Sequence, residues 1–143
     1  MATAQLTAID ATVDKTNKLL GEIEHEFGWP AHRRQQSYAA LSAVLHALRD
    51  RLPLAEAVQL AAQFPVLVRG LYYEGWDPSS APEKLDRAEF VARVRQDFRY
   101  DVDGGAERLI MIVSQVLRRH VSDGEWRDVR ATVPAQLRDL IAA

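Results

Sequence analysis

Apolar residues recur every three or four positions along most of this chain, which is the period of an α-helix. Near the start of the chain they form one stripe, in which Thr16 takes the place of a missing apolar residue. We expect a long helix that begins between Thr7 and Asp10 and ends at Gly28. The stripe consists of Leu6, Ile9, Val13, Leu20, Ile23 and Phe27.

Prolines divide the following stretch into further helices. Pro30 breaks the first helix, and a second is expected over about residues 33–51. Pro53 opens a third helix that runs to about residue 63, and Pro65 opens a fourth that runs to about residue 73. Because there are no alternating Val, Ile and Thr runs bounded by hairpin turns, we predict an all-α fold.

Two helix starts carry a specific signature. Asp86 and Glu89 form an Asp-x-x-Glu capping box directly after a segment rich in turn formers, residues 77–84, which we interpret as a linker. Ser122 and Glu125 repeat the same spacing and predict the start of another helix.

The two halves of the chain match each other. A shift of 69 residues superimposes eight identical residues, and a shift of 71 places Leu19, Ile23, Phe27 and Trp29 on Phe90, Val94, Phe98 and Tyr100. We therefore predict a tandem repeat of two four-helix units, about 9–76 and 85–143, packed around a pseudo-twofold axis as a single domain of about eight helices over 1–143. The identical pairs are Val44/Val113, Leu48/Leu117, Arg49/Arg118, Glu56/Glu125, Ala62/Ala131, Pro65/Pro134, Arg69/Arg138 and Leu71/Leu140.

The segment RGLYYEGWDP, residues 69–78, lies at the junction of the two units. Gly75 fits the left-handed residue that follows a helix, and Trp76 is then expected to close back on Leu71. Tyr72 occupies the place of Ile141, so its ring is expected to be buried with the hydroxyl bonded at the edge. We favour a packing role for this cluster over a ligand cage.

Charged residues that match in both halves are expected to serve the fold. We expect Glu56 and Glu125 each to close a capping box. Arg69 and Arg138 are each expected to reach across from the fourth helix of their unit to the third.

The third helices of the two units differ in polarity. Val58 and Ala61 of the first unit occupy the places of Arg127 and Arg130 in the second. This apolar face needs a cover, either another chain or the extension before Thr16. We favour the extension, since its own apolar residues also need a place to pack.

Composition excludes several classes of protein. The 143 residues include no Cys, so disulfides and thiolate metal sites are excluded, as suits a cytoplasmic protein. The start of the chain lacks the pattern of a signal peptide, and no apolar run could cross a membrane. With 18 Lys plus Arg against 20 Asp plus Glu, no global charge favours nucleic acid or a membrane surface.

Motifs for catalysis or metal binding are weak. Glu22 and His25 have the Glu-x-x-His spacing of di-metal bundles, but the equivalent positions in the second half are Arg93 and Gln96. We therefore expect no metal, no cofactor and no catalytic residue, and the protein is not expected to be an enzyme.

Four stretches of the chain resemble a known bacterial family: KTN, LSAVLHALRDRLP, AAQFPVLVRGLYYEGWDP and GEWRDVRATVPAQLRDL. The family is domain of unknown function family 2267 (DUF2267), and the resemblance spans about Ile9 to Ile141. It implies a small helical protein and assigns no activity or cofactor. Leu19 stands where the family pattern leads us to expect a tryptophan.

We expect a non-enzymatic module that binds a protein or peptide, through a groove between the units or through the face of Val58 and Ala61. The partner is either an unknown protein or a second copy of the chain. The alternative is a small-molecule sensor whose pocket lies at the junction, with Tyr72, Tyr73 and Trp76 as its walls and Arg69 as its charge.

Overall fold

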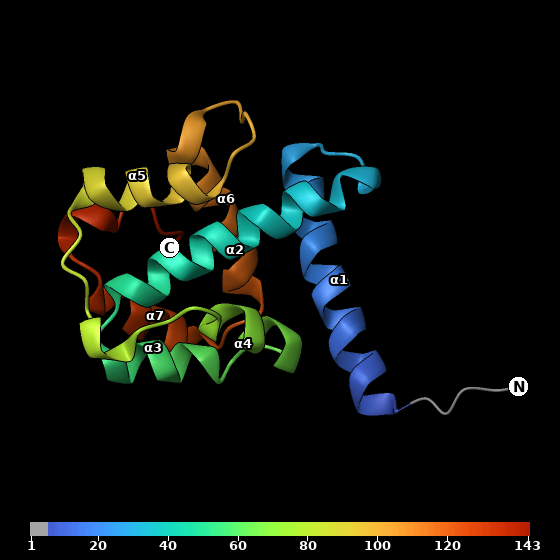
Figure 1. Ribbon diagram of the computed structural model, residues 1–143, viewed down its shortest axis with the longest axis horizontal. Helices are drawn as coiled ribbons and strands as arrows, with labels where there is room; N and C mark the ends of the chain where they lie inside the picture. Colours follow the sequence, from blue (N-terminus) through green and yellow to red (C-terminus); the bar gives the residue numbers. More distant parts are fainter. Residues whose placement is uncertain (1–5) are drawn as a thin grey trace, which may run out of the picture.

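The computed structural model describes residues 6–143, which form an all-α fold without a strand (Figure 1). Three short 3-10 helices accompany the α-helices, at Ala31–Arg33, Pro78–Ser80 and Ala135–Leu137. In this part of the chain there are seven α-helices: α1 (Thr7–Phe27), α2 (Arg34–Arg51), α3 (Leu54–Ala61), α4 (Val66–Tyr73), α5 (Arg87–Asp97), α6 (Gly105–Arg119) and α7 (Asp123–Thr132).

Helix boundaries follow the local signals in the sequence. Pro53 and Pro65 immediately precede α3 and α4, as expected. The side chain of Asp86 accepts from the backbone of Glu89, and the side chain of Glu89 accepts in return from the backbone N–H of Asp86, so the predicted capping box of α5 is confirmed. Helix α1 ends at Gly28 in the left-handed conformation, with a φ of 73°.

Helices from both halves share one hydrophobic core. In Figure 1, α2 crosses the middle of the molecule, with α5 above it and α3 and α4 below. Helix α2 packs on α6, and α3 packs on α7. Helix α1 of the first half packs on α6 of the second half, and α5 of the second half packs on α2 of the first. The core therefore contains residues such as Leu45 and Leu60 together with Ile110 and Trp126.

The expected eighth helix is not an α-helix. Only Ala135–Leu137 forms a 3-10 turn there, and side chains of α7 bind carbonyl groups of the residues that follow it. Trp126 Nε1 donates to the carbonyl oxygen of Ala142 at 2.7 Å, and Arg130 donates to those of Arg138 and Ile141. Arg130 has Ala61 as its counterpart in the first half, which cannot make such bonds.

The expectation that the N-terminal extension covers Val58 and Ala61 was wrong for residues 6–15; residues 1–5 lie outside the part of the chain that the structure describes. Ala61 is buried in the core, whereas Val58 is 46% exposed. The first half of α1 lies beside α4 instead, where the backbone N–H of Leu67 donates to Thr12 Oγ1 at 3.0 Å. Leu6 and Ile9 consequently stay exposed to solvent.

Within residues 6–143, no helix combines the length and the hydropathy that a membrane crossing requires.

Candidate functional site

The junction after α4 is a tight turn built around Gly75. Glu74 is extended, Gly75 has a φ of 73°, and the backbone N–H of Trp76 donates to the carbonyl oxygen of Tyr73 at 3.1 Å. These are the features of a type II turn, which requires a residue such as glycine at its third position. The left-handed Gly75 is therefore confirmed. The Trp76 indole stacks on the ring of Tyr73, with centroids 5.5 Å apart, and its expected contact with Leu71 stays a prediction.

Tyr72 and Arg69 form hydrogen bonds within the fold. The Tyr72 side chain is completely buried, and its hydroxyl donates to the carbonyl oxygen of Ala57 at 2.8 Å, as predicted. Burial raises the pKa of this hydroxyl far above that of a free tyrosine. Arg69 donates to the carbonyl oxygens of Ala61 and Phe64, at 3.1 and 3.0 Å. Both polar groups are thus already paired inside the protein.

The structure brings three of the four predicted binding residues together. The ring of Tyr73 lies against both Tyr72 and Trp76, and Tyr73 and Trp76 are each half-buried. Arg69 points away from this stack, toward the end of α3. Within the stack, Tyr73 and Trp76 retain exposed surface for a ligand, whereas Tyr72 does not.

Arginines at matched positions join the third and fourth segments of each half. Arg138 Nε donates to the carbonyl oxygen of Arg130 at 3.0 Å, and Arg69 Nε makes the equivalent bond to Ala61. This part of the prediction is confirmed, since each guanidinium satisfies carbonyl groups at a helix end that lack helical partners.

The expectation that Glu56 and Glu125 close capping boxes was wrong. Pro53 precedes α3 and offers no side-chain cap, while the backbone N–H of Ser122 donates to Gln63 and not to Glu125. The two carboxyl groups instead meet where α3 packs on α7, together with that of Asp128. One oxygen from each of the three residues lies within 4.8 Å of the others.

This carboxyl cluster, defined by Glu56, Glu125 and Asp128, is partly withdrawn from water. Glu56 is buried, Glu125 is half-buried and Asp128 is exposed. Burial, followed by the hydrogen bond with Glu56 and its charge, raises the pKa of Glu125 to about 8. A carboxyl group in this environment retains a proton near neutral pH unless another cation replaces it.

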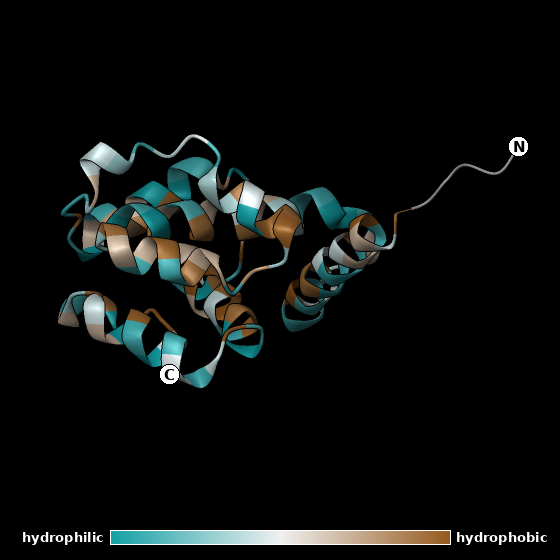
Figure 2. Ribbon diagram, turned by 90° about the horizontal axis from the view of Figure 1, so that it is seen from below, coloured by the Kyte–Doolittle hydropathy of each residue, from teal (hydrophilic) through white to brown (hydrophobic). Residues whose placement is uncertain are grey.

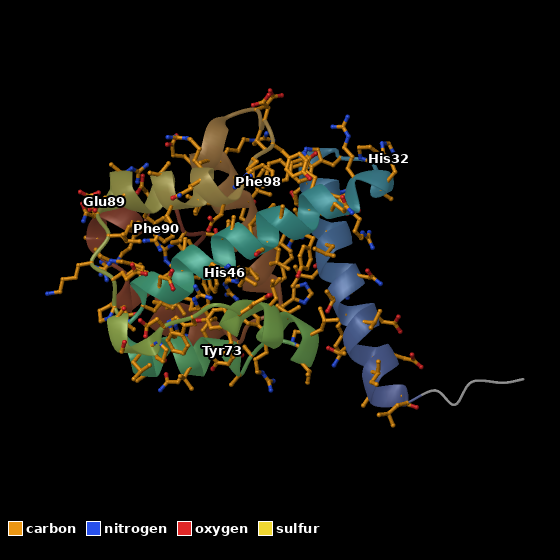
Figure 3. The ribbon with its side chains drawn as sticks, in the orientation of Figure 1. His32, His46, Tyr73, Glu89, Phe90 and Phe98 are labelled. Atoms are coloured by element: carbon orange, nitrogen blue, oxygen red, sulfur yellow. The ribbon has the colours of Figure 1, made fainter. Side chains whose placement is uncertain are left out.

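Two of the histidines, His46 and His120, contact other groups in the fold. His120 Nε2 contacts Glu22 Oε2 across α6 and α1, so Glu22 does not combine with His25, which is exposed. His46, labelled in Figure 3, lies on α2, and its Nε2 is 2.7 Å from the carbonyl oxygen of Leu71 in α4.

A second aromatic group lies where α1 and α5 end. Phe27 stacks on Trp29 at 4.2 Å, and Phe98, labelled in Figure 3, lies 6.2 Å from Trp29 and 5.4 Å from Tyr100. Phe98 and Tyr100 also line a shallow pocket of about 180 Å³ together with Asp101.

Exposed apolar side chains gather on three helices. Among residues 6–143, seven of the nine exposed large hydrophobic residues belong to α3, α4 or the first half of α1 and the residue preceding it. These elements lie along the lower side of the molecule in Figure 1. Figure 2, seen from that side, shows hydrophobic positions in brown on α1 and on the helices facing the viewer. We define the α1–α3–α4 surface as Leu6, Ile9, Val13, Leu54, Val58, Val66 and Leu67.

Comparison with known families gives one match. The model of the uncharacterized conserved protein family DUF2267 matches residues 16–140, which is most of the chain. The protein belongs to the DUF2267 family. No curated protein matches the chain.

In this DUF2267 protein, the contact between the carboxyl groups of Glu56 and Glu125 was not predicted from the sequence. The available signal was their identity in both halves at the shift of 69 residues. Residues that are equivalent in two packed copies meet each other when they lie on the axis between the copies. Of the residues that form the exposed α1–α3–α4 surface, only Val58 was predicted from the sequence to belong to a binding surface.

Proposed function

We propose that this DUF2267 protein is a non-enzymatic interaction module that binds the apolar face of an amphipathic helix in a partner protein. The α1–α3–α4 surface is the proposed binding surface. The absence of Cys from the sequence suits a reducing compartment, and we place the protein in the cytoplasm.

The concentration of exposed apolar residues on one side carries this proposal. Val66 is 67% exposed, Leu6 62% and Ile9 58%. Single exposed apolar residues are normal in any protein, but a contiguous group of them is typical of an interaction surface. The bond between Leu67 and Thr12 holds α4 beside α1, so the apolar residues of these two helices belong to one surface.

The geometry favours a helical partner. Leu6, Ile9 and Val13 follow a helical stripe on α1, and the neighbouring α4 contributes Val66 and Leu67. Two adjacent helices that both expose apolar residues form the kind of platform on which a third helix packs. Compared with the face of Val58 and Ala61 expected from the sequence, the proposed surface keeps Val58 and replaces the buried Ala61 with residues of α1 and α4.

We further propose that the chain is a duplicated unit with pseudo-twofold symmetry. Two pairs of equivalent helices pack on each other, α2 on α6 and α3 on α7, which supports this. The first helix of each half also packs on the second helix of the other half, α1 on α6 and α5 on α2. The equivalent bonds of Arg69 and Arg138 support it as well. The first half of α1 has no counterpart in the second unit, which leaves its apolar residues free for a partner.

A small-molecule sensor is the second candidate. The exposed parts of Tyr73 and Trp76, stacked 5.5 Å apart, favour a planar ligand at the junction. Because Arg69 and Tyr72 already bond to backbone carbonyls, such a ligand has to be recognised mainly by stacking.

Charge placed on the proposed surface tests the interaction. We expect the double variant Ile9→Asp/Val66→Asp to lose a partner that the wild-type protein retains from a native lysate. The control variant Gln35→Asp/Gln96→Asp adds the same charge at exposed positions of α2 and α5 and is expected to keep the partner. Native mass measurement distinguishes a different protein from a second copy. Equal retention by both variants, at equal melting temperatures, would contradict the proposal.

A further inference from the structure

Two helices from opposite halves of the chain supply the carboxyl cluster. Glu125 and Asp128 are three residues apart on α7 and therefore share one face of that helix. Glu56 faces them from the first turn of α3. One oxygen from each lies within 4.8 Å of the other two, although the sequence separates Glu56 from Glu125 by 69 residues.

Two oxygens in this cluster lack a partner. Glu56 is only 8% exposed, and its Oε1 and that of Glu125 are buried with no donor group of the described residues beside them, so the only hydrogen bond open to this pair is through a proton shared between the two carboxyl groups. Other buried charged groups of the protein are paired: Glu24 accepts from Arg34 and Ser37, and Arg49 donates to backbone carbonyls. Burying a carboxylate oxygen without a donor or a cation is unfavourable, so these two oxygens indicate a bound positive species.

We propose that Glu56, Glu125 and Asp128 bind a hard divalent cation, of the Mg²⁺ or Mn²⁺ class, between α3 and α7. All three donors are carboxylate oxygens, which such cations prefer, and the cluster contains no imidazole or thiolate that would select a softer metal. Asp128 is exposed, so one side of the site is open for the cation and for the water molecules that complete its coordination.

The cation joins the two halves of the chain. It is bound by one helix of each half, and it cancels the repulsion between carboxylates that the packing of α3 on α7 brings together. This site is distinct from the proposed interaction surface, although α3 contributes residues to both.

Mn²⁺ binding measures the site directly. Full-length protein is freed of metal with a chelator, transferred to chelator-free buffer at about pH 8 and titrated with Mn²⁺ while free Mn²⁺ is followed by electron paramagnetic resonance. We expect one Mn²⁺ per chain, displaced by Mg²⁺, and a melting temperature that rises with Mn²⁺ concentration. Glu56→Gln is expected to weaken binding by about tenfold or more, because it removes a charged ligand.

Two further variants keep the test decisive. Asp128→Asn changes an exposed residue and is expected to fold normally, so its weakened binding supports the proposal even if Glu56→Gln does not fold. Glu107→Gln, at an exposed position in the first turn of α6, is expected to bind Mn²⁺ like the wild type.

A shared proton is the competing occupant of the cluster. If the protein binds no Mn²⁺, or if Asp128→Asn and Glu56→Gln bind it as tightly as Glu107→Gln does, the proposal is wrong. The pair of glutamates then holds a proton only.

Discussion

Glu24, near the end of α1, joins this helix to the first turn of α2, and its replacement tests how much this contact stabilises the fold. Its carboxylate accepts from Arg34 Nε at 3.0 Å, from an Arg34 terminal nitrogen at 2.9 Å and from Ser37 Oγ at 2.6 Å. Arg34 also donates to Asn17 on α1. The Glu24 side chain is only 6% exposed, so water replaces little of this network when it is broken.

We expect Glu24→Gln to lower the free energy of unfolding by about 2–3 kcal/mol at neutral pH. A hydrogen bond to a charged group contributes about 1.5–3 kcal/mol, and the variant loses the charge in two such bonds while its amide oxygen still accepts from Ser37. Arg34 is 38% exposed and is partly rehydrated, which limits the loss. For a chain of this length the melting temperature falls by about 4–10 °C.

The effect depends on pH in a defined direction. The hydrogen bonds from Arg34 are the main cause that lowers the pKa of Glu24 below the ordinary value of 4.5. A carboxyl group with a lowered pKa stabilises the fold above its ordinary pKa, and this contribution is lost as the pH falls through the lowered value. The difference between wild type and Glu24→Gln is therefore expected at neutral pH and is expected to shrink toward zero in acid.

Urea unfolding followed by circular dichroism at several pH values measures this difference. Glu107→Gln serves as the control, since Glu107 is exposed and is expected to change stability by less than about 0.5 kcal/mol. A loss for Glu24→Gln that is no larger than that of the control, or that stays constant into acid, would refute the reasoning.

Three further replacements probe the contacts that hold the helix ends. Arg138→Met is expected to lower the melting temperature by an amount equivalent to about 0.5–1 kcal/mol, because it removes the donor to the carbonyl of Arg130 at an exposed position where water replaces part of the bond; an unchanged melting temperature would show that the bond is unimportant. Tyr72→Phe removes the donor to Ala57 and is expected to cost about 1 kcal/mol in urea unfolding, whereas equal stability would mean that the hydroxyl contributes nothing. Trp126→Phe loses the bond to Ala142 and is expected to speed amide hydrogen exchange in residues 135–143 while α1 stays protected; uniform exchange across the chain would argue against a local effect.

Local signals in the sequence predicted the helices well, because the signals and the structures they specify lie within a few residues of each other. Pro53, Pro65, Gly28 and the pair of Asp86 with Glu89 each act on the backbone next to them. The end of α4 was harder to predict, since both a helix stop and a type II turn accept a left-handed Gly75. The extended backbone of Glu74 and the bond from the Trp76 N–H to the Tyr73 carbonyl oxygen identify the turn.

Long-range packing could not be read in the same way. Glu125 sits three residues after Ser122, which is the spacing of a capping box, so its contact with Glu56 became visible only once α3 and α7 were placed together. The apolar stripe on α1 was correctly recognised, but its periodicity does not tell which neighbour covers it. The bond of Leu67 to Thr12 places the first half of α1 beside α4. Leu20 and Ile23 are buried in the core, whereas the N-terminal part of the stripe, Leu6, Ile9 and Val13, remains exposed.

A site-specific photocrosslink tests whether the α1–α3–α4 surface binds a partner. A photoreactive amino acid is placed at Ile9 or Val66 on the surface, or at Gln96 on α5 as the control, and the protein is irradiated in living cells. The account predicts the same discrete adduct from positions 9 and 66 and none from position 96. No adduct from either surface position, or the same adduct from position 96, would contradict it.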